Sequence, residues 1–182
     1  MMSEIEFEKI GKFSKAGPTY TSYPTALEFN EDFKYDDYIR YLESGKEKIS
    51  IYIHLPFCRS ACYFCGCNVV FTSKEDKLDK YVNYLKREID ILVKHIDTTR
   101  EVIQFHFGGG TPTYYSADSL DEIVTYVKSK FTNWNKEAEI SCEIDPRFFN
   151  EEQMQIFAKH GFNRISFGVQ DFDARVQEAI HR

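Results

Sequence analysis

The stretch that decides the fold runs from Tyr52 to Asn68 and reads Tyr-Ile-His-Leu-Pro-Phe-Cys-Arg-Ser-Ala-Cys-Tyr-Phe-Cys-Gly-Cys-Asn. It begins as a β-rich run and ends in a loop that carries Cys58, Cys62, Cys65 and Cys67. Three thiolates at a C-x3-C-x2-C spacing can hold three irons of a four-iron, four-sulfur cluster, which leaves the fourth iron open to a ligand. The loop therefore predicts iron–sulfur chemistry directly after a strand.

Short β-rich runs alternate with longer helical patterns from residue 50 onward. This alternation favours βα units and a parallel sheet. The predicted strands are Ser50–Leu55, Val102–Phe107, Glu139–Asp145 and Asn163–Gln170, and the predicted helices are Lys74–His95, Ser119–Phe131 and Glu151–His160, the last closed by Gly161 as its C-cap. The cysteine loop then lies at the carboxyl end of the first strand, where barrel-type α/β proteins place their active sites.

The four strands show a clear difference between their two faces, since alternate residues of a strand point to opposite sides. One face is apolar: Ile51, Ile53, Leu55, Ile103, Phe105, Phe107, Ile140, Cys142, Ile144, Ile165, Phe167 and Val169. The other is largely polar: Tyr52, His54, Gln104, His106, Ser141, Glu143, Ser166, Gly168 and Gln170. We expect the apolar face to pack under the helices and the polar face to line a wet lumen that holds a polar ligand, unlike the packed interior of an ordinary barrel.

Composition limits the class of protein. The chain has 182 residues, 42% of them hydrophobic, and a formal net charge of -6 from interleaved charges. This argues against disorder and against a nucleic-acid partner, and favours a small-molecule one. The start of the chain resembles no leader and no run approaches a membrane span, which predicts a cytoplasmic protein.

Two domains are expected, an N-terminal extension over residues 1–49 and a βα region over residues 50–182. The extension contains a loop at residues 17–26 and a predicted helix, Tyr35–Glu43, closed by Gly45. It does not repeat the βα pattern of the rest of the chain.

A structural zinc site is the main alternative for the cysteine loop. Zinc sites with four cysteines usually take two C-x2-C pairs separated by a longer spacer, whereas here four cysteines lie within ten positions. An odd total of five cysteines and this crowding also argue against a disulfide framework. Cys142 lies on the apolar face and is best interpreted as a core residue.

Several motifs together resemble the radical S-adenosylmethionine (SAM) superfamily, and within it the oxygen-independent coproporphyrinogen III oxidases. They are Tyr-Thr-Ser-Tyr-Pro-Thr-Ala (20–26), Tyr-Ile-His-Leu-Pro-Phe-Cys (52–58), Cys-Tyr-Phe-Cys-Gly-Cys-Asn (62–68), Phe-Gly-Gly-Gly-Thr-Pro-Thr (107–113), Glu-Ile-Asp-Pro-Arg (143–147) and Ser-Phe-Gly-Val-Gln-Asp-Phe (166–172). Cys67 favours the oxidases over the related haem chaperones, which typically lack it. The role of Cys67 is left open.

The resemblance implies ligands for each part of the site. Cys58, Cys62 and Cys65 would hold the cluster, and SAM would chelate the open iron. Tyr52, Gly109 and Glu143 would contact a first SAM, and Phe64, Gly110, Thr111 and Gln170 a second. Arg182 would meet a ligand carboxylate, for which a planar guanidinium is suited.

Plainer interpretations stand beside these. The glycine run could be a tight turn, because glycine is common where φ must be positive. Glu143 could be paired at the surface, and Arg182 could be solvated. His54 and His106 are more often hydrogen-bonded structural residues than ligands.

The resemblance implies a radical oxidative decarboxylation of two propionates of coproporphyrinogen III to give protoporphyrinogen IX in haem biosynthesis. An electron donor and acceptor would be needed, and the full-length protein would be a monomer. Four βα units are fewer than the six of this superfamily's barrel, so we expect a truncated, open partial barrel of the radical SAM type that does not turn over alone. Another radical SAM paralogue, a zinc module or a non-catalytic porphyrin-binding fragment are the alternatives.

Overall fold

The computed structural model of the chain describes residues 28–63 and 65–182. The motif at 20–26 and the proposed SAM contact Phe64 lie outside these ranges. The chain divides into two units, Met1–Tyr38 and Ile39–Arg182. The helix α2 (Tyr35–Ser44) crosses this division and agrees with the helix predicted there. The domain boundary between residues 49 and 50 stays a prediction.

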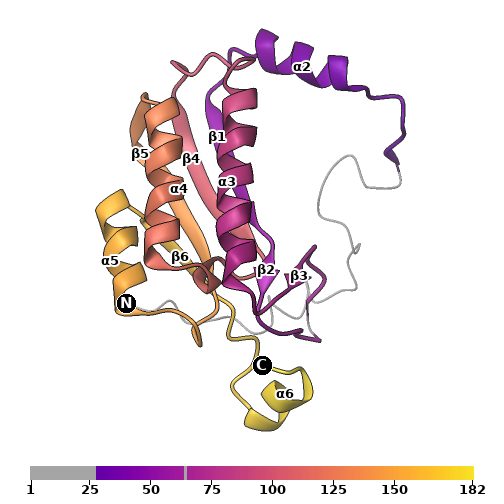
Figure 1. Ribbon diagram of the computed structural model, residues 1–182, viewed down its shortest axis with the longest axis vertical. Coiled ribbons are helices and arrows are strands. Elements are labelled where there is room, and N and C mark those ends of the chain that lie inside the picture. Colours follow the sequence, from indigo (N-terminus) through magenta and orange to yellow (C-terminus); the bar gives the residue numbers. More distant parts are fainter. Residues whose placement is uncertain (1–27, 64) are drawn as a thin grey trace, which may run out of the picture. The chain divides into compact units, whose positions relative to one another are not determined.

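The second unit is built on one parallel sheet (Figure 1). Its strands are β1 (Ile49–Leu55), β4 (Val102–Gly109), β5 (Trp134–Ile144) and β6 (Arg164–Phe167), in the order β1-β4-β5-β6. All three neighbouring pairs are parallel. The sheet is open rather than closed, which confirms the predicted partial α/β fold.

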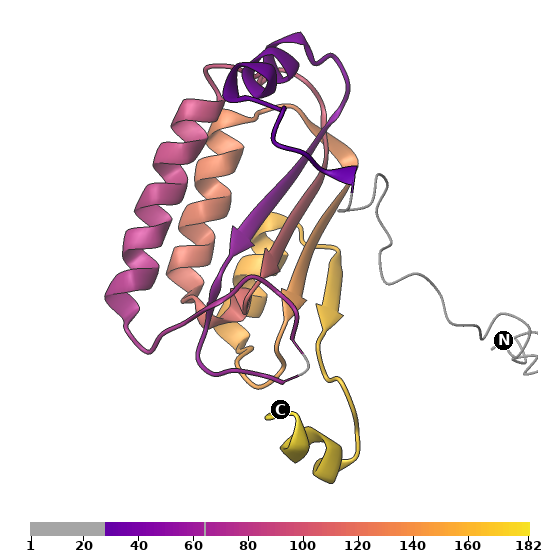
Figure 2. The same ribbon diagram turned by 90° about the vertical axis from the view of Figure 1, so that its right-hand side faces the viewer.

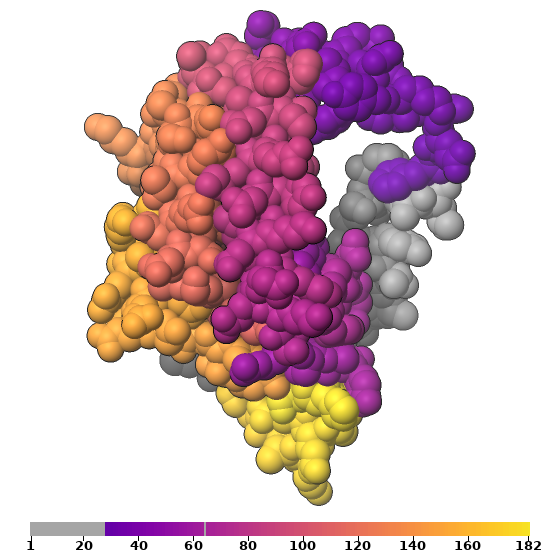
Figure 3. All heavy atoms as spheres, in the orientation of Figure 1, coloured from indigo at the N-terminus to yellow at the C-terminus, as the bar shows by residue number. Residues whose placement is uncertain are grey.

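Helices α3 (Glu75–Leu92), α4 (Ala117–Lys130) and α5 (Glu151–His160) cover one face of this sheet (Figure 2). Their outer surfaces fill much of the view in Figure 3. The helix α5 has clear sequence signals at both ends: a capping box of Asn150 and Gln153 begins it, and Gly161 ends it with a φ of 79°. All three helices lie where the sequence predicts them.

The core lies between the helices and the predicted apolar face of the sheet. Leu55, Phe105, Phe107 and Cys142 are completely buried there. Val102 occupies the core in place of the predicted Ile103, because the pairing of β4 shifts in register between Val102 and Gln104.

The fourth strand corrects two predictions. Strand β6 ends at Phe167, so Gly168 to Gln170 lie beyond it and not within the sheet. Its apolar side chains are also exposed, with 38% of Ile165 and 54% of Phe167 accessible. The reason is position: β6 is the edge of the described sheet and pairs with β5 alone.

The short elements gather at the carboxyl edge of the sheet. They are β2 (Phe57–Cys58), β3 (Val70–Phe71), the 3-10 helix η2 (Pro112–Tyr114) and α6 (Ala174–Ala179). Since all strands are parallel, every loop that leaves a strand at its carboxyl end reaches this same edge. No helix in the described part of the chain is long and apolar enough to cross a membrane.

Candidate active site at the carboxyl edge of the sheet

The cysteine loop is closed at its base by a small parallel ladder. Strands β2 and β3 pair at Phe57 with Val70 and at Cys58 with Phe71. The Val70 N–H donates to the Pro56 carbonyl at 2.8 Å, and the Thr72 N–H donates to the Cys58 carbonyl at 3.1 Å. These bonds join the two ends of the loop to each other, directly after β1.

The glycine run after β4 packs directly against the start of this loop. The Gly110 N–H donates to the Leu55 carbonyl at 2.8 Å, and the Thr111 N–H donates to the Phe57 carbonyl at 3.0 Å. A Cβ at Gly110 would lie 2.6 Å from the Pro56 carbonyl oxygen, so no side chain fits there. Gly109 has a φ of 112°, which favours glycine.

The three proposed cluster ligands each have a polar neighbour at the sulfur. Cys58 Sγ lies 3.3 Å from the Thr111 hydroxyl, and Cys65 Sγ accepts from the Cys67 N–H at 3.3 Å. Cys62 Sγ accepts from Arg182 Nη1 at 3.3 Å. Burial raises the pKa of the Cys58 thiol, and the neighbouring cysteine charges add to this, against the lowering effect of the Thr111 hydrogen bond.

The sulfurs do not converge on a single ion. Among residues 28–63 and 65–182, no group of three His, Cys, Asp or Glu side chains is placed to hold one metal. A four-iron cluster makes a different demand, because each cysteine binds a separate iron. Thiolates spread around one cavity, with hydrogen-bond donors at their sulfurs, fit that group.

A cavity of about 400 Å³ lies in front of these sulfurs. It brings together Cys58, Cys62, Cys65, Cys67, Gly109, Gly110, Thr111, Glu143, Gln170 and Arg182. These residues come from five segments that are far apart in the sequence: 58–67, 109–111, 143, 170 and 182. Cys142 lies apart from them, completely buried in the core, where burial raises the pKa of its thiol.

Tyr52 is not among the residues that line this cavity. It lies along the open face of the sheet, where its hydroxyl is 3.0 Å from His54 Nδ1 and its ring stacks on His106 at a centroid distance of 5.8 Å. His106 Nε2 lies 3.8 Å from Glu143 Oε1, which does line the cavity. Burial raises the pKa of Tyr52, and the charges of Glu143 and Cys67 raise it further.

Both histidines on this face have hydrogen-bond partners. His54 Nε2 is 2.9 Å from the Asn68 carbonyl, and His106 Nδ1 is 2.8 Å from the Ser141 hydroxyl. Their geometry agrees with the structural interpretation offered by the sequence.

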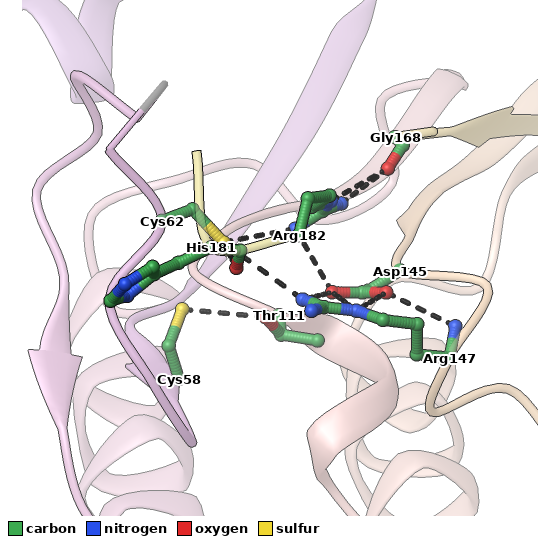
Figure 4. Close-up of polar contacts among 8 residues, drawn as sticks. All are labelled: Cys58, Cys62, Thr111, Asp145, Arg147, Gly168, His181 and Arg182. Atoms are coloured by element: carbon green, nitrogen blue, oxygen red, sulfur yellow. Dashed lines mark hydrogen bonds and ion pairs between the residues drawn. The ribbon is translucent and has the colours of Figure 1, made fainter. Parts of the chain in front are cut away.

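Figure 4 shows an ionic cluster beside the cysteines that sequence reasoning missed. The Asp145 carboxylate, 4% exposed, accepts from Arg147 Nη2 at 2.6 Å and lies 3.0 Å from Arg182 Nη1. Burial alone would raise the pKa of Asp145, but the hydrogen bonds and charges of the two arginines lower it below its ordinary value. The position of Asp145 directly after β5, inside the quoted motif 143–147, was the available signal.

The two remaining predicted contacts lie beyond β6. Gln170 has a φ of 72°, which is uncommon for a residue with a side chain, and it lines the cavity. Arg182 follows α6, and 14% of its side chain is exposed. Its guanidinium also donates from Nε to the Gly168 carbonyl at 3.0 Å. The Arg182 side chain is therefore fixed by contacts within the protein and is not solvated.

The class of protein follows from comparison with known families. The model of the radical SAM superfamily matches residues 52–182. This range contains the cysteine loop, the cavity and the sheet from Tyr52 onward, and the chain is therefore a member of that superfamily.

Relatives narrow the class to one family. The chain is 54% identical over 186 residues to the oxygen-independent coproporphyrinogen III oxidase of Helicobacter pylori strain 26695. It is 44% identical over 148 residues to the protein of that name from Mannheimia haemolytica, and the match covers 80% of this chain and 100% of that one. The chain therefore belongs to the oxygen-independent coproporphyrinogen III oxidase family.

A solved structure agrees with this. Coproporphyrinogen III oxidase from Escherichia coli, described as a radical SAM enzyme, superposes with a TM-score of 0.82 at 38% identity and covers 98% of this chain. The match covers 39% of that structure and 41% of the Helicobacter relative. The chain thus spans about two fifths of the length of these two relatives.

Proposed function

We propose that this chain carries the cluster-binding and SAM-binding part of an oxygen-independent coproporphyrinogen III oxidase. The observation that carries the proposal is convergence: the three cysteines, the glycine run, Glu143, Gln170 and Arg182 line one cavity at the carboxyl edge of the sheet. In open α/β folds this edge is where ligands bind.

Each group has a task in this proposal. Cys58, Cys62 and Cys65 hold a [4Fe-4S] cluster, which when bound supplies the one-electron chemistry that splits SAM. Gly109 contacts a first SAM through its backbone, and the Glu143 carboxylate, which lines the same cavity, binds it as well. Tyr52 does not line the cavity, but its ring stacks on His106, which in turn contacts Glu143. In this way Tyr52 positions Glu143.

A second SAM is proposed in the same cavity. Gly110 and Thr111 line the cavity there, Gln170 offers an amide, and Arg182 offers a guanidinium suited to a carboxylate. For Phe64, a contact with the second SAM is proposed from the family resemblance alone. The reaction proposed for an active site of the relatives' full length converts two propionates of coproporphyrinogen III to vinyl groups. Each propionate loses carbon dioxide and a hydrogen atom, and one electron passes to an acceptor.

The cluster assignment is tested on the purified chain, reconstituted with iron and sulfide without oxygen. We expect about four irons and four sulfides per chain, on the cluster type that three cysteines define. Alanine variants of Cys58, Cys62 and Cys65 should each lose the cluster.

The matched control is Cys142→Ala, which removes a thiol that is buried in the core and does not line the cavity, so the variant should keep the full iron content. A chain that takes up zinc instead of iron, or a Cys58→Ala variant with unchanged iron, would contradict the assignment. Incubation of a chain built to the length of the Helicobacter relative with coproporphyrinogen III, SAM and reductant then tests the substrate, with protoporphyrinogen IX as the expected product.

A further inference from the structure

The buried carboxylate of Asp145 has no assigned task, although it sits at the centre of the cluster in Figure 4. It follows Ile144, the last residue of β5, so the sheet fixes its position. Only 4% of its side chain is exposed. A carboxylate so deeply buried is costly unless cations and hydrogen bonds compensate it.

Two arginines provide that compensation from different parts of the chain. Arg147 donates from Nε at 3.0 Å to one carboxylate oxygen and from Nη2 at 2.6 Å to the other. Arg182 places Nη1 at 3.0 Å from the second oxygen. The carboxylate is therefore the link between the loop after β5 and the residue that follows α6.

Both guanidinium groups also reach the same cysteine. Arg182 Nη1 lies 3.3 Å from Cys62 Sγ, and Arg147 Nη2 lies 3.9 Å from it. Each is the nitrogen that also contacts Asp145. The guanidinium groups of Arg147 and Arg182 thus both contact the Cys62 sulfur. Each of them also contacts the Asp145 carboxylate.

We propose that Asp145 is a positioning residue that keeps the guanidinium groups of Arg147 and Arg182 at the Cys62 sulfur and thereby raises the reduction potential of the cluster. Reduction adds an electron to the cluster, and cationic N–H donors at a ligand sulfur stabilise the more negative state. This inference rests on the proposed cluster ligands. Asp145 itself contacts neither cluster nor SAM in this proposal.

The sign of the shift distinguishes positioning from a simple charge effect. If the arginines stayed in place, Asp145→Asn would remove a negative charge near the cluster and raise its potential. If Asp145 positions them, the variant frees both cations from the sulfur, and the potential falls. A redox titration followed by electron paramagnetic resonance on the reconstituted chain measures this directly.

The matched control is Asp121→Asn. Asp121 also pairs with two basic side chains, Lys159 at 2.7 Å and His160 at 2.5 Å, but it lies on α4 and its partners lie on α5. The Asp121→Asn substitution removes the same charge without touching the cysteine loop, so the reduction potential of the cluster should not change. Arg147→Gln, at a side chain 37% exposed, is the second variant and tests the inference if Asp145→Asn fails to fold. It should lower the potential less than Asp145→Asn does.

A measurement without iron tests the positioning itself. In Asp145→Asn, hydrogen exchange of the Arg147 Nε–H, followed by nuclear magnetic resonance, should be about tenfold faster or more, as expected for loss of a charge-assisted hydrogen bond. A higher or unchanged potential in Asp145→Asn, or unchanged exchange at Arg147, would overturn the inference. A wild-type chain that binds no cluster would instead overturn the proposed function.

Discussion

Among the glycines of the site that the structure describes, Gly110 is the one whose added side chain would collide with backbone atoms. A Cβ there would lie 2.6 Å from the Pro56 carbonyl oxygen, at the place where the glycine run meets the cysteine loop. Gly110→Ala should lower the free energy of unfolding by about 2 kcal/mol, because two hydrogen-bonded backbone segments must move apart. Urea unfolding of the iron-free chain measures this.

Gly66→Ala is the matched control within the cysteine loop. No atom lies within 4 Å of the Cβ it would add, so its unfolding curve should match that of the wild type. Equal stability of the two variants would show that the packing of the glycine run against Pro56 is not tight.

Asp145 also predicts how stability depends on pH. The pKa of Asp145 lies below its ordinary value of 3.8, because Arg147 and Arg182 stabilise its charged form. Its contribution is therefore complete above pH 3.8 and is lost as the pH falls through the lower folded value. Asp145→Asn should cost about 2 kcal/mol at pH 7, and this difference should shrink below pH 3.8.

Denaturant unfolding of the iron-free wild type and variant across pH 2.5 to 7, a range set by that pKa, measures this difference. A difference that stays constant over the whole range would contradict the proposed ion pairing.

At this scale the sequence predicted the cysteines and several residues that line the cavity with them, but not the polar contacts at the cysteine sulfurs. The spacing of Cys58, Cys62 and Cys65 is local, so a single loop reveals it. The contact of Cys62 with Arg182 joins residues 120 positions apart, and only the packing of the loops creates it. Asp145 and Arg147 could have been suspected from their place after a strand, but their partner could not.

At the scale of elements, the capping of α5 makes the clearest prediction. The Asn150 side chain accepts from the Gln153 N–H at 2.9 Å, and Gln153 returns a bond to the Asn150 N–H. Gln153 also donates to the Thr113 and Tyr115 carbonyls, which ties α5 to the loop that follows the glycine run. Asn150→Ala should therefore lower the free energy of unfolding by about 1 kcal/mol, measured by urea unfolding.

Lys74→Ala is the control for this cap. Lys74 occupies the same position in α3 but makes no side-chain capping bond. Its replacement should leave stability within about 0.5 kcal/mol of the wild type. An equal loss in both variants would show that the capping box of α5 contributes nothing of its own.

Strand parity predicted which face of the sheet the helices cover, because alternation is a local property. Strand parity did not predict burial correctly where burial depends on having a neighbouring strand on both sides. Ile165 and Phe167 have the same apolar pattern as the central strands but lie on β6, the edge of the described sheet. The end of β6 was also missed, since Val169 and Gln170 continue the apolar and polar alternation after the pairing stops at Phe167.

At the scale of the whole chain, one parallel sheet explains why distant motifs form one site. Residues 58–67, 108–111, 143–147 and 166–170 each follow or end a strand, and parallel strands bring them to one edge. The chain covers 39% of the Escherichia coli structure that it resembles. The cavity described here is therefore built from residues that match this 39% of the Escherichia coli structure.

The central claim is that Cys58, Cys62 and Cys65 hold a four-iron cluster with one iron open to SAM. Electron paramagnetic resonance of the reduced, reconstituted chain, recorded with and without SAM, tests it most directly. We predict the signal of a reduced [4Fe-4S] cluster whose g values change when SAM is added, because SAM binds the open iron. A signal that SAM leaves unchanged, or a chain that binds zinc and gives no iron signal, would contradict the claim.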